Sequence, residues 1–147
     1  MIVSMDNGGN VCSGMFAAKM ELLGSISEFL ERCADKLRLS KDALVRINLV
    51  AEELFVNTVR HGYGGDSESP VWIGLRRVGD GLELAFEDLA PAFNPYPFEA
   101  GKTRKLELAV EERPVGGLGL LLTCEMSLKQ DYAYLFGRNC VRLRVKG

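Results

Sequence analysis

The strongest constraint on the fold is a pair of strand–turn–strand segments, one in the middle of the chain and one at its end. The runs VWIGLRRV (71–78) and GLELAFED (81–88) are joined by the turn GDG, and DYAYLF (131–136) and CVRLRV (140–145) are joined by GRN (137–139). Connections this short join antiparallel strands, because parallel strands need a crossover of roughly a dozen residues or more. These segments therefore predict a largely antiparallel sheet.

Three other segments are predicted to be helical. Apolar residues recur at helical spacing from about Ala17 to Leu37, and Ser40 is placed as the N-cap of a second helix that runs to about Arg60. A third, short helix fits residues 119–127, GLLLTCEMS. Three helices on one face of an antiparallel sheet would give an α+β fold, a two-layer α/β sandwich.

The length suits a single domain over residues 1–147. Residues 1–14 are rich in Gly and Asn, and we expect a disordered terminus or one short strand there. The stretch from about 90 to 116 is rich in proline and carries Lys102, Arg104 and Lys105. Because connections of this length are uncommon and often functional, we expect a lid over a binding site.

Composition excludes some classes of function. A net charge of −2, from 18 basic and 20 acidic residues, argues against direct nucleic-acid binding, which normally needs a basic excess. No run approaches the roughly 18 consecutive apolar residues of a membrane span, and the first residues lack the pattern of a signal peptide. The cysteines show no CxxC pair and no zinc-ligand spacing; they are Cys12, Cys33, Cys124 and Cys140. We therefore expect a reduced, cytoplasmic protein with four thiols.

A line of polar residues interrupts the apolar second helix. Glu53, Asn57 and the only histidine, His61, recur every four residues, and Arg46 and Arg60 fall in the same stripe as Glu53 and Asn57. The stripe is either a solvated face or the wall of a ligand cavity. In a cavity, the Asn57 oxygen could hold Mg²⁺, which needs only one or two protein ligands beside phosphate and water. Glu53 could deprotonate a hydroxyl nucleophile, and His61 is expected to finish the helix.

Asp88 is the one carboxylate on the apolar face of its predicted strand, which it shares with Leu82, Leu84 and Phe86. A buried carboxylate without a partner is strongly destabilising, so Asp88 needs a hydrogen-bond donor. The exocyclic amine of adenine would serve. The alternative is that Asp88 lies just past the strand and begins a turn.

The segment PVGGLGLLL (114–122) places Gly116, Gly117 and Gly119 directly before a predicted helix. Free N–H groups at a helix N-terminus bind phosphate well, although loop glycines are also common as simple turns. The segment is not a P-loop, because no Gly-Lys-Ser/Thr follows. It also does not open a βαβ unit as the Rossmann motif does.

Taken in order, these motifs resemble the ATPase fold shared by gyrase, histidine kinases and the heat-shock chaperones. The likeness is strongest to a stand-alone branch, the anti-sigma factor serine/threonine protein kinases of bacteria. AEELFVNTVRHGY (51–63) resembles the N box of that family, EDLAPAFNP (87–95) its first glycine box and VGGLGLLL (115–122) its second. The resemblance extends from about residue 18 to the end of the chain.

The resemblance implies roles for the matching residues. Glu53 matches the catalytic base, Asn57 the magnesium ligand, and Asp88 the acceptor of the adenine amine. Further contacts to the nucleotide are implied at Ala90, Phe93, Gly117, Leu118 and Gly119. The implied cofactors are ATP and Mg²⁺, and the implied reaction transfers the γ-phosphate to a serine or threonine of an anti-sigma factor antagonist. Members of this family are typically dimers that also sequester a sigma factor, so we expect a homodimer.

The chain departs from the family pattern beside the adenine. Ala90 replaces the glycine usual after the aspartate, and Cys140 stands where many members have a threonine. These departures keep open a second function, a non-catalytic partner-switching module with weak or lost ATP binding. A third, the catalytic half of a histidine kinase, needs a phosphoacceptor histidine, and His61 in the N box is the only histidine.

Overall fold

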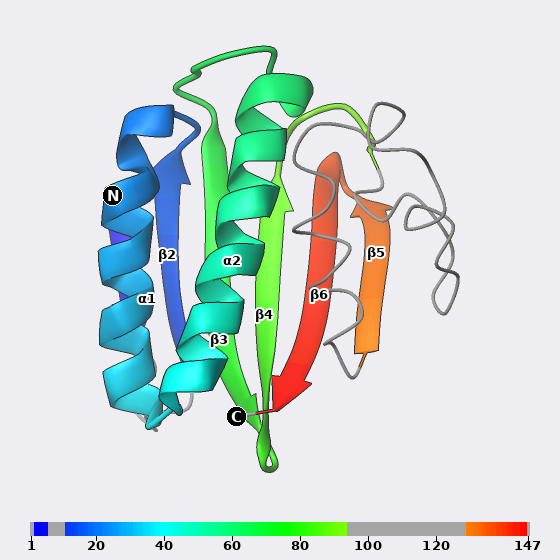
Figure 1. The fold of residues 1–147 in the computed structure, drawn as a ribbon. Coiled ribbons are helices and arrows are strands. Elements are labelled where there is room, and N and C mark those ends of the chain that lie inside the picture. The colour runs from blue at the N-terminus through cyan, green and yellow to red at the C-terminus, as the bar shows by residue number, and fades with distance from the viewer. Residues whose placement is uncertain (1, 6–10, 94–128, 147) are drawn as a thin grey trace, which may run out of the picture.

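The computed structural model describes residues 2–5, 11–93 and 129–146. Within these ranges, six strands form one sheet in the order β1-β2-β3-β4-β6-β5, and each pair of neighbours is antiparallel (Figure 1). The strands are β1 (Ile2–Met5), β2 (Val11–Ala17), β3 (Pro70–Val78), β4 (Gly81–Asp88), β5 (Lys129–Leu135) and β6 (Arg138–Lys146). The predicted antiparallel sheet is confirmed.

Two α-helices, α1 (Leu23–Leu37) and α2 (Lys41–Asn57), lie side by side on one face of the sheet (Figure 1). Ser40 caps α2 as predicted, because its Oγ accepts a hydrogen bond from the backbone N–H of Ala43 at 3.1 Å. The helix does not stop at its last α-helical residue but continues into a π-helical turn, Thr58–Gly62. The predicted α+β, two-layer arrangement is confirmed.

The N-terminal segment differs from the prediction. In place of a disordered end or one short strand over residues 1–14, β1 and β2 form a hairpin, and helical structure begins with a 3₁₀ turn at Met20–Leu22 rather than near Ala17. The strands were not predicted because this segment is rich in glycine, which is uncommon in strands. Gly14 is buried within β2, and a Cβ there would lie 3.1 Å from the ring of Phe16. It is therefore a strand glycine packed under an aromatic ring rather than a loop residue.

The C-terminal hairpin is confirmed, but its turn lies earlier than predicted. The turn residues are Phe136 and Gly137, with φ of 53° and 76°, whereas the sequence pattern suggested a turn over 137–139. Two successive residues with positive φ are typical of a tight hairpin. Because β6 begins at Arg138, Asn139 joins the buried face of this strand with Val141, Leu143 and Val145.

The central strands place a polar group at one end of an apolar face. As predicted, β4 buries Leu82, Leu84, Phe86 and Asp88 on the side that faces the helices. In the strand register, Asp88 is opposite Val71 of β3 and Asn139 of β6. Two polar residues on neighbouring strands are therefore adjacent at the edge of the hydrophobic core.

The prediction of four thiols is wrong. Cys12 of β2 and Cys33 of α1 form a disulfide with 5.8 Å between their Cα atoms. Sequence spacing could not reveal this pair, because 21 positions separate its members and the fold brings a strand and a helix together. Closing a loop of this length stabilises a protein by roughly 3 kcal/mol. Cys140 is free.

Several predictions lie beyond the described residues. They are the helix expected at 119–127, the lid beyond Phe93 and the predicted thiol of Cys124. The cytoplasmic location also stays a prediction. Among the described helices, none combines the length and the apolar character needed to cross a membrane.

Candidate functional site

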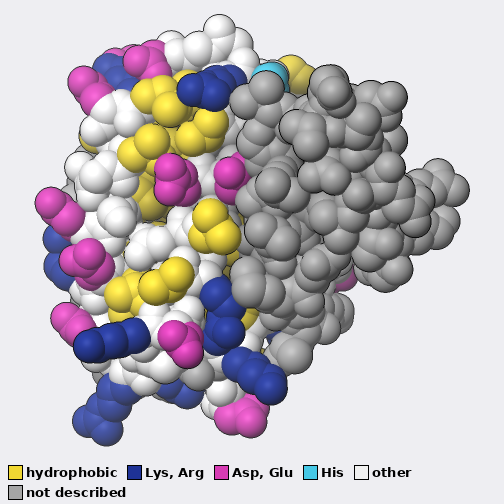
Figure 2. Space-filling model, viewed as in Figure 1, with side chains coloured by type: hydrophobic (Ala, Val, Ile, Leu, Met, Phe, Trp, Pro, Cys, Tyr) yellow, Lys and Arg dark blue, Asp and Glu magenta, His cyan; other side chains and the backbone are white. Residues whose placement is uncertain are grey.

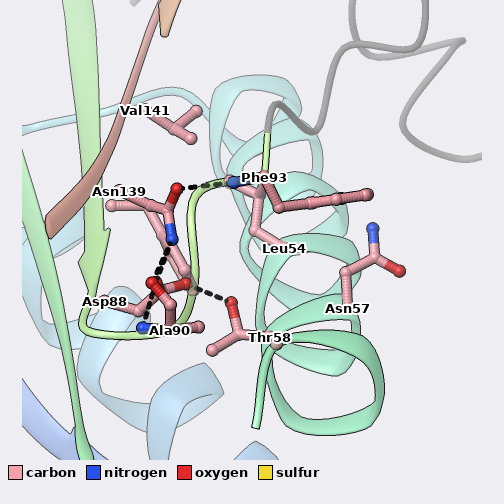
Figure 3. Close-up of a pocket in the computed structure, with 10 residues that line it drawn as sticks. Leu54, Asn57, Thr58, Asp88, Ala90, Phe93, Asn139 and Val141 are labelled. Carbon is pink, nitrogen blue, oxygen red and sulfur yellow. Dashed lines mark hydrogen bonds between the residues drawn. The ribbon is translucent and has the colours of Figure 1, made fainter. Parts of the chain in front are cut away.

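A pocket lies between the C-terminal part of α2 and the adjoining ends of β4 and β6 (Figure 3). Its lining combines apolar side chains with a small number of polar groups, and consists of Leu54, Asn57, Thr58, Gly62, Phe86, Asp88, Ala90, Phe93, Asn139 and Val141. The cavity has a volume of about 30 Å³. The structure thus brings together four of the predicted site residues, Asn57, Asp88, Ala90 and Phe93.

The Asp88 carboxylate is the polar centre of this pocket, and the residue is only 6% exposed. Its Oδ2 accepts a hydrogen bond from Thr58 Oγ1 at 2.8 Å; its Oδ1 accepts from Asn139 Nδ2 at 2.8 Å and from the backbone N–H of Ala90 at 3.0 Å. These three donors offset the cost of burying the charge. A carboxylate has about four acceptor positions, so one more donor can still be accommodated.

Both interpretations of Asp88 from the sequence, a buried strand residue and the first residue of a turn, are partly correct. The residue is the last of β4 and is buried on the apolar face, as the strand pattern predicted. Its bond to the N–H of Ala90 also makes it the first residue of the turn that leaves the strand. The position serves both roles because the turn begins where the core ends.

Asn139, and not Cys140, is the β6 residue beside Asp88. The placement of Cys140 near the adenine is wrong, because β6 begins at Arg138 and alternate side chains face opposite sides of a sheet. On the far side, the thiol of Cys140 donates to Glu87 Oε1 at 3.2 Å. Burial, followed by this carboxylate, raises the pKa of the thiol. The sequence pattern would have indicated Asn139 only if the last strand had been predicted to begin at residue 138 rather than 140.

Thr58 is the second site residue that sequence reasoning missed. It is the first residue of the π-helical turn and is 6% exposed. Such turns occur often at functional sites. The sequence does place a hydroxyl residue directly after Asn57. The prediction considered only polar residues spaced four apart along the helix and therefore did not include it. The hydroxyl now anchors the end of α2 to the carboxylate of Asp88.

The two residues predicted to carry chemistry, Glu53 and Asn57, are one helical turn apart on α2, and both are half-buried. The Asn57 carboxamide lies apart from the Asp88 cluster and has no hydrogen-bond partner among the described residues (Figure 3). Burial raises the pKa of the Glu53 carboxyl, and the neighbouring Glu52 raises it further. A raised pKa brings a carboxylate closer to the range in which a general base works well.

The polar stripe of α2 is not simply a solvated face. At its start, Arg46 reaches β6, where its Nη2 donates to the carbonyl of Lys146 at 3.4 Å. At its end, Asn57 lines the pocket, while Arg60 and His61 are exposed. On the described surface of the helix-bearing side, charges of both signs are interspersed with apolar side chains (Figure 2). The stripe therefore follows the side of α2 that borders β6.

Ala90 is accommodated because a glycine faces it. A Cβ built on Gly62 would lie 2.9 Å from the Cβ of Ala90, so the two positions share room for one methyl group. The departure from the family glycine at position 90 is thus matched by Gly62 in the turn after α2. The other predicted nucleotide contacts, Gly117, Leu118 and Gly119, lie outside the described residues.

The fold and the pocket together define an α+β domain that buries a hydrogen-bonded carboxylate beside a small pocket. Comparison with protein families then identifies its relatives: the family described as histidine kinase-like ATPase domain matches residues 16–145. Because the match spans most of the chain, this protein belongs to that family. A comparison with curated proteins gives no significant match. Family membership indicates an ATP-binding domain with a kinase-like role.

The described residues fit the base-binding part of such a site. Leu54, Phe86 and Val141 supply apolar walls for a flat ring, and Asp88 can accept one further donor. Asn57 offers a carboxamide oxygen that no described residue occupies. One such ligand suffices for Mg²⁺, which takes most of its shell from phosphate and water.

Proposed function

We propose that this protein is an ATP-dependent serine/threonine protein kinase that transfers the γ-phosphate to an anti-sigma factor antagonist. The observation that carries the proposal is the meeting, at one pocket, of the buried acceptor Asp88 with α2, on which Asn57 follows Glu53 by one turn. Family membership supports the ATP-binding part of the proposal. The serine/threonine specificity is supported by the resemblance of three motifs in order.

Each residue would have a distinct task. Asp88 would accept the adenine amine at its free acceptor position, and Asn57 would hold Mg²⁺. ATP would supply the transferred phosphoryl group, with Mg²⁺ neutralising its charge. Glu53 would take the proton of the attacking hydroxyl, a task suited to a carboxylate whose pKa is raised by burial.

The proposed partners follow from the same resemblance. They are an anti-sigma factor antagonist as phosphoacceptor and a sigma factor as the sequestered protein, with the kinase acting as a homodimer. No membrane or nucleic-acid contact is part of the proposal. The phosphorylated segment of the antagonist would have to reach Glu53, which lies one helical turn before Asn57 on α2.

A transfer assay tests the proposal. Purified protein is incubated with γ-labelled ATP, Mg²⁺ and an antagonist protein that binds it, and the phosphorylated residue is then identified. We expect acid-stable label on serine or threonine of the antagonist. Acid-labile label on a histidine would contradict the serine/threonine assignment and favour the catalytic half of a histidine kinase.

A second function, a partner-switching module without catalysis, is favoured by one observation. The cavity beside Asp88 measures about 30 Å³, whereas pockets for drug-sized ligands or cofactors measure roughly 300–1,000 Å³. A protein that binds its partner without nucleotide would show no transferred label, and its affinity for the antagonist would not depend on ATP.

A further inference from the structure

Asn139 joins the Asp88 carboxylate to the chain that leaves β4. The residue is 5% exposed. The two hydrogens of its Nδ2 are shared among three acceptors: Asp88 Oδ1 at 2.8 Å, the carbonyl of Ala90 at 3.0 Å and the carbonyl of Pro91 at 3.1 Å. One amide group therefore contacts both the recognition carboxylate and the first turn beyond it.

The oxygen end of the same amide holds the next part of that chain. Asn139 Oδ1 accepts from the backbone N–H of Phe93 at 2.9 Å and from the Tyr132 hydroxyl at 2.6 Å. The Tyr132 oxygen also accepts from the N–H of Phe93, at 3.0 Å. Because a carboxamide has donors at one end and an acceptor at the other, Asn139 can bind residues 90–91 and residue 93 at the same time.

Among the described residues that line the pocket, Ala90 and Phe93 are the two outside any helix or strand. The remaining lining belongs to α2 and its π-helical turn, or to the central strands β4 and β6. Residues 90–93 are held instead through side chains, chiefly Asn139 and Tyr132. The cavity of about 30 Å³ is far smaller than the roughly 300–1,000 Å³ of ligand pockets, so part of its lining must move before a purine ring can enter. Residues 90–93 are the described part of the pocket wall that no helix or strand holds in place.

We propose that Asn139 is a positioning residue that sets nucleotide affinity by holding residues 90–93 closed over the pocket until a nucleotide displaces them. The inference rests on the proposed nucleotide site. In this arrangement the amide keeps the Asp88 carboxylate oriented for the base, while its bonds to Pro91 and Phe93 oppose entry. The apparent affinity is then reduced by the fraction of molecules that are closed.

Two variants separate these roles. Asn139→Thr keeps a short hydroxyl beside Asp88 but cannot span to residue 93, and Tyr132→Phe removes only the hydroxyl that assists Asn139. Tyr134→Phe on the same strand is the matched control, since Tyr134 is 46% exposed. Amide hydrogen exchange of the free protein and stopped-flow association of a fluorescent ATP analogue are measured for each variant, together with the thermal midpoint.

We expect exchange of the Phe93 amide to accelerate about two- to tenfold in Asn139→Thr, which is the usual effect of losing one hydrogen bond on such an equilibrium. The Leu89 amide should be unaffected, since Tyr63 holds it at 2.8 Å. Association of the ATP analogue should accelerate by a similar factor in Asn139→Thr and by less in Tyr132→Phe. Tyr134→Phe should behave as the wild type in both measurements.

The other outcomes overturn the inference in different ways. Unchanged exchange at Phe93 would show that Asn139 does not hold this wall. Faster exchange with unchanged or slower association would show that the wall does not limit entry. Absence of analogue binding by the wild type and by every variant at millimolar concentration would instead overturn the proposed nucleotide site itself.

Discussion

The Asp88 cluster and the Glu53–Asn57 pair lie at neighbouring parts of one candidate site, yet their hydrogen bonding is opposite. Asp88 already accepts from three donors, all of them on residues that are themselves buried. The side chains of Glu53 and Asn57 make no hydrogen bond to any described residue and are half-buried. The group that we propose to recognise the nucleotide is therefore already hydrogen-bonded, whereas the two groups that we propose to act on it make no such bond to the described residues.

The difference has a physical basis. A buried carboxylate must be hydrogen-bonded even without a ligand, or the fold is destabilised, so the three hydrogen bonds to Asp88 contribute to the stability of the protein. A half-buried carboxylate or carboxamide can be satisfied by water until a metal or substrate replaces it. Variants of the Asp88 cluster should therefore affect stability, whereas variants of the α2 pair should affect chemistry.

The largest expected effect concerns Glu53. Glu53→Gln should slow phosphoryl transfer by about 10²–10⁴-fold, the usual contribution of a general base, while the affinity for ATP changes by less than about twofold. Single-turnover transfer and calorimetric titration measure the two quantities. Glu52→Gln, at an exposed neighbouring position, is the control. Transfer by Glu53→Gln at the wild-type rate would remove Glu53 from the role of base.

The next effect concerns the hydroxyl that anchors α2 to Asp88. Thr58→Val keeps the shape of the side chain but leaves Asp88 Oδ2 without its donor at 2.8 Å. We expect the free energy of unfolding to fall by about 1–3 kcal/mol, the range for a buried group left unsatisfied. Urea titration checks this, and Thr58→Ser, which keeps the hydroxyl, should lose much less. If Thr58→Val and Thr58→Ser lowered the free energy of unfolding equally, packing rather than the hydrogen bond would account for the effect.

A comparable loss of stability is expected from a substitution at Gly62, because a Cβ at this position would lie 2.9 Å from the Cβ of Ala90. Gly62→Ala should lower the free energy of unfolding by about 1–3 kcal/mol through overpacking. Adding Ala90→Gly to this variant should restore part of the loss. Gly24→Ala is the control, because a Cβ there meets nothing within 4 Å. Strict additivity of the two changes in urea titrations would show that these positions do not compete for space.

The smallest effect is the pH dependence of Glu53. Burial raises the pKa of this carboxyl in the folded protein, so the folded state binds its proton more tightly than the unfolded chain does. The group therefore favours folding most at low pH, and this contribution falls as pH rises through the unfolded and then the folded pKa. The thermal midpoint of the wild type should fall relative to Glu53→Gln as pH rises above the ordinary pKa of a glutamate, about 4.3. A constant difference would contradict the raised pKa.

The sequence predicted those parts of the fold that follow from a single periodicity. Alternation correctly placed every second residue of β4 on its buried face, namely Leu82, Leu84, Phe86 and Asp88, and Asn57 of the helical stripe lines the pocket. The N-cap at Ser40 was equally clear, because its hydroxyl acts within one turn. Local rules suffice where the interaction is local.

The errors arose where the outcome depends on contacts distant in sequence or on a strand boundary. β2 was missed because Gly14 owes its place to the ring of Phe16, and the disulfide joins Cys12 to Cys33 across the core. Asn139 was missed because it was assigned to the turn, and the family resemblance placed its neighbour Cys140 beside the adenine instead. Since side chains alternate along a strand, neighbouring residues cannot both face Asp88.

The most direct test of the account is a calorimetric titration of the protein with ATP, with and without Mg²⁺, beside the variant Asp88→Asn. The account predicts binding that is strengthened by Mg²⁺ and weakened at least about tenfold in the variant, since a hydrogen bond to a charged acceptor is worth about 1.5–3 kcal/mol. Absence of binding at millimolar ATP, or equal affinity in Asp88→Asn, would contradict the assignment of Asp88 as the group that recognises the nucleotide.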